Sequence, residues 1–449
     1  MQIFDIIFSI FIIAGAAIVA HSIYSKNIET RWHYALYKKA LYARIVFAFI
    51  FVAIYTFYYD GGDTTAYFSG ARSIVLLGQK DFGAVFRVLI GERTYELYSL
   101  FDSATGYPEY FHDPNAWSVC RFMVPFYFLG FGSIWGTTLA LAIVMFFLLW
   151  DFYKMLCRLY PKECKYMSVA LFFLPSILFW SSGILKDVWC LVAVLQLYKA
   201  MWLVFFRKHS IVPNIFRYVV CAYVLISIRP FVFYTALAAS LLWLVFWRVK
   251  TVQNKLIRVS TFPVILITSI MGIIVVLNLL GESVEGKYGS FDSMLQHAVI
   301  IQGDLKQDYY GGNSFDIGHF DATIQSMLSK VPIATVSGLF RPFLWEGSSV
   351  FLKVSALEAA LILFFCVYLC IKTRIIGLIK IITNDSFLSS LCIYVVILAF
   401  FTGLSIANFG ALVRYRIVYL PFFCIIVLRV WGASRKRDEV PDSDYQGFF

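Results

Sequence analysis

Two apolar stretches near the start of the chain decide the class of fold: IFDIIFSIFIIAGAAIVAHSI at 3–23 and IVFAFIFVAIYTFYY at 45–59. The first is long enough to cross a lipid bilayer as a helix, and the second nearly so. Because it carries Asp5 and no basic residues precede it, we interpret the first stretch as an anchor and not as a cleaved signal peptide. The loop between the two stretches is basic, which predicts a cytoplasmic loop and an N-terminus outside; its basic residues are Lys26, Arg31, Lys38, Lys39 and Arg44.

The composition of the whole chain agrees with a membrane protein. Of its 449 residues, 60% are hydrophobic and only 14% are charged, whereas a soluble domain has about 25% charged residues. This excludes a cytosolic enzyme, a nucleic-acid-binding module and a secreted disulfide scaffold. Most of the nine cysteines lie in apolar runs, and the six histidines follow no metal-binding spacing, so no metal site is predicted.

Further apolar runs follow, and they predict an all-α, polytopic membrane bundle of about 11 spans. The domain prediction is one transmembrane domain over 1–432 and a charged cytoplasmic tail at 433–449. The domain has outer loops at about 60–120, expected to be polar and largely irregular, and at about 281–351. Within the first loop, 80–100 has the pattern of short amphipathic helices, and 118–132 that of an interfacial helix broken at Gly130 and Gly132. The remaining spans are expected near 134–153, 166–182, 184–206, 217–228, 231–247, 259–280, 352–371, 386–406 and 417–431.

The net charge of +11 fits this topology without a nucleic-acid partner. On the predicted arrangement most Lys and Arg residues fall in cytoplasmic loops, as they do in membrane proteins generally. The informative charges are therefore those left at the outer boundary of the membrane. They are Asp60, Asp63, Lys186, Asp187, Arg229, Arg341, Glu346, Arg414 and Arg416.

Charges at membrane depth are costly, and they usually serve a function. Arginine and lysine suit a phosphate or pyrophosphate group, and a nearby carboxylate can take a proton from an attacking hydroxyl. Most of these residues also have a structural interpretation: helix caps for the three Asp residues and Lys186, a loop tip for Arg229, and a local ion pair for Arg341 with Glu346. Weaker candidates are Lys199, Glu358, His112 and Asp113.

Several of these segments resemble the GT-C superfamily of membrane glycosyltransferases and the O-antigen-polymerase-type proteins of bacterial surface-polysaccharide clusters. The segments are DGGD at 60–63, PSILFWSSGILKD at 175–187, RPFLWE at 341–346 and GALVRYR at 410–416. The resemblance implies a catalytic Asp in the first outer loop, which would be Asp60 or Asp63. It also implies that cations hold the lipid phosphate. Here the acidic loop follows the second span, which requires an extra N-terminal helix.

The function predicted from the residues and the resemblance is a glycosyltransferase or polysaccharide polymerase of the bacterial inner membrane. It would move a sugar or oligosaccharide from a polyprenyl (pyro)phosphate-linked donor to a saccharide or lipid acceptor on the outer face. Many proteins of the superfamily use a divalent cation, but the carboxylates here are too few to predict one. The alternatives are a transporter or flippase for lipid-linked saccharides, and a structural partner in an envelope complex. A transporter should have charges near the bilayer midplane, which the predicted topology does not place there.

Overall fold

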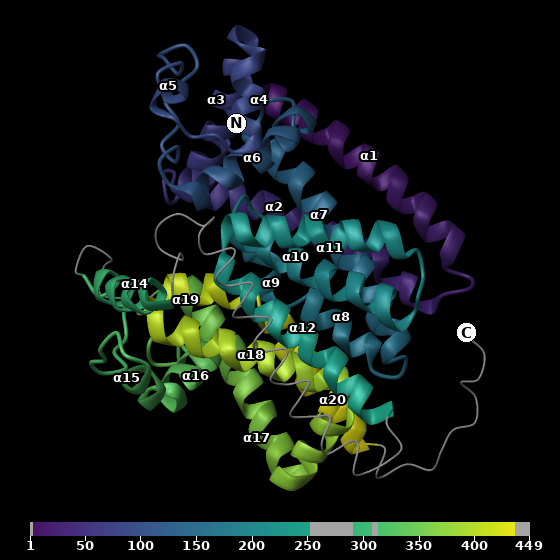
Figure 1. Cartoon of the computed structure of the whole chain (residues 1–449). Helices are drawn as coiled ribbons and strands as arrows, with labels where there is room; N and C mark the ends of the chain where they lie inside the picture. The colour runs from purple at the N-terminus through teal and green to yellow at the C-terminus, as the bar shows by residue number, and fades with distance from the viewer. Residues whose placement is uncertain (1–2, 252–290, 308–312, 348, 436–449) are drawn as a thin grey trace. The chain divides into compact units, whose positions relative to one another are not determined.

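The computed structural model describes residues 3–251, 291–307, 313–347 and 349–435 (Figure 1). Every named element of these residues is a helix, and their only strand pairing is one isolated bridge between Ser314 and Asn408. Eight of the helices are long and apolar enough to cross a membrane, or nine if one bent pair counts as a span. The predicted helical, multi-pass character is therefore confirmed. The predicted span at 259–280 and most of the predicted tail at 433–449 lie outside the described residues.

The chain divides into two compact units. Unit 1 comprises Met1–Met155, Leu171–Ala236 and Val413–Val418, and unit 2 comprises Leu156–Ala170, Leu237–Leu412 and Tyr419–Phe449. Four helices contribute residues to both units: α7 (Ile134–Leu159), α8 (Cys164–Phe172), α12 (Pro230–Thr251) and α19 (Phe409–Arg416). The other helices of unit 1 are α1 (Ile3–Asn27), η1 (Trp32–Leu36), α2 (Tyr37–Phe57), α3 (Asp63–Lys80), α4 (Phe82–Ile90), α5 (Tyr95–Tyr98), α6 (Pro114–Leu129), α9 (Pro175–Trp180), α10 (Lys186–Met201), η2 (Trp202–Phe206) and α11 (Ile211–Ile228).

The loop at 60–120, which we predicted to be largely irregular, is mostly helical. It consists of α3, α4, α5 and the first turns of α6. Helix α3 packs along α6, where Gly70 leaves room for Cys120. The prediction was wrong because it used only the polarity of the local sequence, which does not report a contact between segments that are far apart in the chain. The predicted short helices within 80–100 are present as α4 and α5, and α6 ends at Leu129, just before Gly130.

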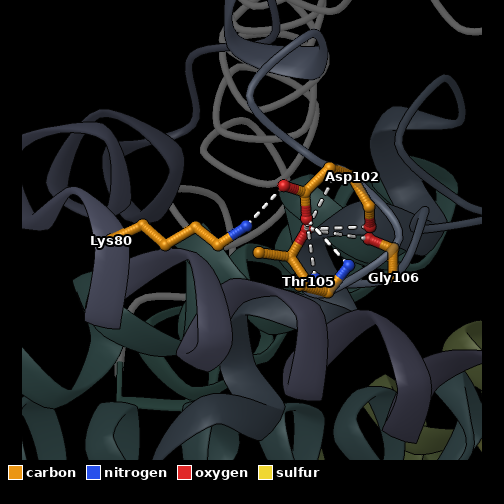
Figure 2. A network of polar contacts seen from close by, with 5 residues as sticks. Lys80, Asp102, Thr105 and Gly106 are labelled. Atoms are coloured by element: carbon orange, nitrogen blue, oxygen red, sulfur yellow. Dashed lines mark hydrogen bonds and ion pairs between the residues drawn. The ribbon is translucent and has the colours of Figure 1, made fainter.

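A network of polar contacts fixes the irregular part of this loop to the end of α3 (Figure 2). Asp102 Oδ1 accepts hydrogen bonds from the backbone N–H groups of Ala104 and Thr105, and Lys80 Nζ lies 2.5 Å from Asp102 Oδ2. The hydrogen bond from Lys80 and those from the backbone hold the pKa of Asp102 well below its usual range. Since these partners are local and exposed, we interpret the network as a set of contacts that stabilises the loop and not as a functional site.

The span predicted at 166–182 is wrong as a single helix. The chain forms α8, breaks before Pro175, forms α9, and then runs without helical structure from Ser181 to Leu185. Proline disfavours a helical conformation of the residue before it, which accounts for the break. The non-helical segment 181–185 is buried throughout, so its backbone polar groups need partners inside the protein.

Helix α2 supplies the first of these partners. Arg44 is buried, and its guanidinium donates to the backbone carbonyl of Ser181 and, at 2.7 Å, to the Ser181 hydroxyl. Arg44 lies about 20 Å along the axis from Phe57, the last residue of α2. The prediction that Arg44 belongs to a cytoplasmic loop is therefore wrong: it lies within a candidate span.

Segment 181–185 continues along α2 toward the end of that helix. A Cβ atom on Gly183 would lie 2.0 Å from Phe51 Cε1, so only glycine fits at this approach. Leu185 packs against Phe51 and Tyr55, and the Thr64 hydroxyl donates to the carbonyl of Ile184. These contacts bring the start of α10 next to the start of α3.

Unit 2 also contains α14 (Phe291–Asp304), α15 (Ile324–Ser329), α16 (Val331–Phe340), α17 (Val350–Asn384), α18 (Ser386–Ser405) and α20 (Leu420–Arg435). The predicted spans at 352–371, 386–406 and 417–431 correspond to α17, α18 and α20. Helix α17 extends beyond its prediction and is broken at Arg374, whose φ of 58° lies outside the helical region. An apolar cavity of about 250 Å³ adjoins this break, between α16, α17, α18 and α20.

Candidate functional site

Five of the nine predicted site residues meet at one place in unit 1. Arg414 is the centre: its Nη2 lies 2.5 Å from Asp63 Oδ2, and its Nε lies 2.7 Å from Asp187 Oδ2. The second oxygen of Asp187 lies 2.6 Å from Arg229 Nη1. Lys186 completes the group and pairs, at 3.9 Å, with a further carboxylate, that of Asp113. We call these residues the Asp63 cluster: Asp63, Asp113, Lys186, Asp187, Arg229 and Arg414.

The ends of helices deliver these side chains. Asp63 is the first residue of α3, after a turn in which Gly61 and Gly62 have φ values of 128° and 102° that favour glycine. Asp113 caps α6, and its Oδ1 accepts from the backbone N–H groups of Asn115 and Ala116. Carboxylates are favoured at helix N-termini.

The remaining members also lie at breaks between helices. Lys186 and Asp187 form the first turn of α10, directly after segment 181–185. Arg229 lies between α11 and α12 because Pro230, the first residue of α12, ends the preceding helix. Arg414 lies on α19, which is only eight residues long.

Burial separates the cluster into an inner and an accessible layer. The side chain of Asp187 is 0% exposed and that of Arg229 is 5% exposed. Asp113 is 40% exposed, Asp63 29%, Arg414 19% and Lys186 18%. Only the four members of the accessible layer can therefore touch a ligand without rearrangement.

The inner layer is held by aromatic as well as ionic contacts. The Arg229 guanidinium lies 3.8 Å from the centroid of the Tyr415 ring, within the range of a cation–π interaction. The side chain of Asn115 on α6 donates to the carbonyl of Ser227, two residues before Arg229. The position of Arg229 is thus fixed from α6, α10 and α19.

Asp63 is ionised at neutral pH. Burial raises the pKa of Asp63, but the Arg414 guanidinium and the Tyr110 hydroxyl outweigh burial and hold this pKa below its usual value. The Tyr110 hydroxyl donates to Asp63 Oδ1 at 2.6 Å. Burial and the same carboxylate raise the pKa of Tyr110, which therefore stays protonated and remains a donor.

The other four predicted site residues are placed differently. Asp60 is exposed in the turn before α3, three residues from Asp63. Arg416 is buried, two residues beyond Arg414. In unit 2, Arg341 Nη1 lies 3.6 Å from Glu346 Oε1, and Glu346 also accepts from the backbone N–H of Phe343. Arg341 and Glu346 are five residues apart, and their contacts agree with the interpretation of the pair as a local ion pair.

Sequence reasoning missed Tyr110 and Tyr415, and it gave Asp113 too little weight. A tyrosine among 28 carries no signal of its own in the sequence. Asp113 did carry one, since Asp before Pro114 is typical of a helix start. Including Asp113 changes the electrostatics: three cations face three carboxylates, so an incoming anion must compete with the protein's own acids.

The donor set of the Asp63 cluster does not fit a divalent cation. Among the described residues no group of three His, Cys, Asp or Glu side chains is placed to hold a metal ion. The carboxylates that could contribute bind Arg and Lys instead.

Comparison of the chain with protein-family models, with curated proteins and with solved structures finds no match in any of the three.

Proposed function

We propose that the Asp63 cluster is the active site of a membrane glycosyltransferase or polysaccharide polymerase that uses a polyprenyl (pyro)phosphate-linked donor. The observation that carries the proposal is the convergence of an accessible carboxylate with two accessible cations at the ends of three helices. An inverting transfer needs these two kinds of group: a base for the acceptor and positive charge for the departing phosphate.

In the proposed reaction Asp63 is the general base. The acceptor hydroxyl forms a bond to the anomeric carbon of the donor sugar, and its proton passes to Asp63. The bond from that carbon to the phosphate oxygen breaks, and the electron pair leaves with the phosphate. Asp63 suits this role because it is ionised and because it is the most exposed carboxylate on Arg414.

Lys186 and Arg414 are the proposed ligands of the phosphate. The ion pair of Lys186 with Asp113 is the longest in the cluster, at 3.9 Å, so this ammonium group is the easiest for another anion to capture. A phosphate that engages Arg414 would weaken its pair with Asp63. Donor binding would thereby raise the basicity of Asp63 at the moment when the base is needed.

Asp187 and Arg229 are positioning residues in this proposal. Since Asp187 is fully buried between Arg229 and Arg414, it orients Arg414 and does not touch the substrate. This assigns Arg229 a supporting role in place of the phosphate contact that the resemblance implies, and it gives Asp187 the same supporting role.

The test uses the purified full chain in liposomes with a panel of polyprenyl-phosphate-linked sugars, and mass spectrometry to detect sugar transfer. Asp63→Asn should lower the transfer rate by roughly 100- to 10,000-fold, the usual contribution of a general base, and should retain polyprenyl phosphate binding. Lys186→Gln should weaken that binding. Glu109→Gln, on the same loop and exposed, is the matched control. Full transfer by Asp63→Asn would exclude the proposed base.

A transporter of lipid-linked saccharides is the second candidate, because of segment 181–185 and Arg44. Non-helical backbone within the membrane, with a buried charge beside it, is typical of transporter binding sites. Arg44, which was expected in a cytoplasmic loop, lies within a candidate span and donates to the Ser181 hydroxyl. Movement of a labelled lipid-linked saccharide across the liposome bilayer, with the saccharide chemically unchanged, would favour this candidate over the enzyme.

A further inference from the structure

A second charged cluster in unit 1 has a composition unlike that of the Asp63 cluster. Asp151 on α7 binds three cations: Lys199 Nζ at 2.5 Å, Lys154 Nζ at 2.9 Å and Arg217 Nη1 at 3.4 Å. Lys199 also donates to the backbone carbonyl of Asp151. We call these four residues the Asp151 cluster: Asp151, Lys154, Lys199 and Arg217.

The Asp151 cluster contains three cations and one carboxylate, so two of its positive charges are not neutralised within the cluster. Among the described residues its three cations form ion pairs with Asp151 alone. The Asp63 cluster, by contrast, has equal numbers of cations and acids. An uncompensated charge of this size beside low-dielectric surroundings attracts an anion.

The position of the cluster indicates which kind of anion. Lys199 lies about 20 Å along α10 from Lys186, toward the exposed loop at 207–210. Lys154 and Arg217 each keep 37% of their side-chain surface exposed, so both can reach a group at the membrane boundary. The pair of buried Lys199 with partly buried Asp151 forms the base of the site.

The surface next to Arg217 is apolar and uncovered. On α11 the side chains of Val212, Ile215 and Phe216 are all exposed. This helix is a candidate span with few buried residues, so hydrocarbon is the medium that suits this face. A free phosphate would use the cations and leave the apolar face unused.

We propose that the Asp151 cluster binds the headgroup phosphate of an anionic membrane phospholipid, whose acyl chains lie along the exposed face of α11. The phosphate oxygens accept from Arg217 and Lys154. The predicted topology places this cluster on the cytoplasmic side, where anionic lipids give the membrane surface its negative potential.

The test measures binding of fluorescent phosphatidylglycerol to the full chain in neutral detergent micelles. Arg217→Gln and Lys154→Gln should each weaken binding about five-fold, the usual effect of one basic residue near a charged membrane surface. Asp151→Asn should strengthen binding, because it removes the competing carboxylate. Arg72→Gln, an exposed cation elsewhere in unit 1, is the control and should leave binding unchanged.

The opposite effects of Arg217→Gln and Asp151→Asn on lipid binding distinguish a lipid site from a purely structural ion-pair network. If Asp151→Asn weakened binding together with Arg217→Gln, the proposal would be overturned. Soluble glycerol phosphate that displaced the lipid at equal concentration would also overturn it in favour of a small-anion site. Should Asp151→Asn fail to fold, Lys154→Glu gives a second test. It changes the charge by two units at an exposed position and should weaken binding about 25-fold.

Discussion

Asp187 is the residue on which the geometry of the Asp63 cluster depends. Its carboxylate is fully buried and holds two arginines, one on each oxygen. Removing one partner of a buried ion pair leaves an uncompensated charge, which costs more than the pair itself contributes. The role of Asp187 can therefore be separated from that of Asp63 by measuring stability and activity in parallel.

Asp187→Asn should lower the free energy of unfolding by roughly 3–5 kcal/mol, because Arg229 keeps its charge in a buried site. Chemical denaturation of the full chain in detergent micelles measures this loss. Glu109→Gln, an exposed change in the same unit, should stay within about 0.5 kcal/mol of the wild type. Unchanged stability of Asp187→Asn would mean that water or another group replaces the carboxylate.

Asp63 should give the protein an acid-sensitive stability. Since its pKa in the folded protein lies below the ordinary value of 3.8, Asp63 contributes stability above that value. The contribution disappears as the pH falls through the lowered pKa. Asp63→Asn should therefore flatten the dependence of the melting temperature on pH below about pH 4. Glu109→Gln should keep the wild-type slope, and an equal slope for Asp63→Asn would refute the assignment.

Residue identity predicted much of the cluster, because charges near apolar runs are rare and stand out. Asp63, Lys186, Asp187, Arg229 and Arg414 all carried that signal. The sequence could not predict the burial of each side chain, because nothing in the neighbouring residues distinguishes buried Asp187 from accessible Asp63. Tyr110 and Tyr415 act through contacts made by the fold, so their roles appear only when the helix ends are brought together.

At the scale of elements, the segment between α9 and α10 is the feature that positions the site. The predicted spans at 166–182 and 184–206 met within this segment, but both were expected to be helical up to that junction. Pro175 was present in the sequence, but one proline does not reveal that the chain beyond it leaves the helix for five residues. The partners that make this possible, Arg44 and Phe51, lie more than 100 residues away.

Gly183→Ala tests whether this segment must approach α2 closely. The new Cβ would overlap the Phe51 ring, and overpacking of this kind costs about 1–3 kcal/mol. Phe51→Leu should restore part of the loss in the double variant, and a double-mutant cycle on unfolding free energies measures the coupling. Gly15→Ala is the control because nothing lies within 4 Å of its added Cβ. Additive effects of the two changes would mean that the segment moves away freely.

At the scale of the whole molecule, the contacts give a check on the predicted sidedness. All members of the Asp63 cluster were predicted to lie on the outer side. All members of the Asp151 cluster were predicted inside or at the inner ends of spans. In unit 2, Arg429 Nη1 lies 2.7 Å from Glu163 Oε1 and 3.8 Å, through Nε, from Asp385 Oδ2, and these three residues were also predicted inside. Among these ion pairs none joins residues predicted on opposite sides.

The contact of Arg44 with Ser181 departs from this pattern. It does so because the positive-inside rule counts charges by their position in the sequence and cannot recognise an arginine that satisfies backbone within a span. Within each unit, the ion pairs thus agree with the predicted sidedness of the loops. Their absolute orientation still depends on the distribution of basic residues, which makes it the part of the topology to test directly.

We expect a cysteine at Ala104 to react with a membrane-impermeant maleimide in intact cells, and cysteines at His209 or Asn384 to react only after permeabilisation. All three positions are exposed, so their reactivity reports the side of the membrane and not burial. The background variant replaces the nine native cysteines, all of which are free thiols. Ala104 belongs to the loop that holds Asp63. Labelling of Ala104 and His209 from the same side would therefore contradict the proposal that the active site lies on the outer side. Reversed labelling of all three positions would keep the clusters intact and move the proposed transfer to the cytoplasmic face.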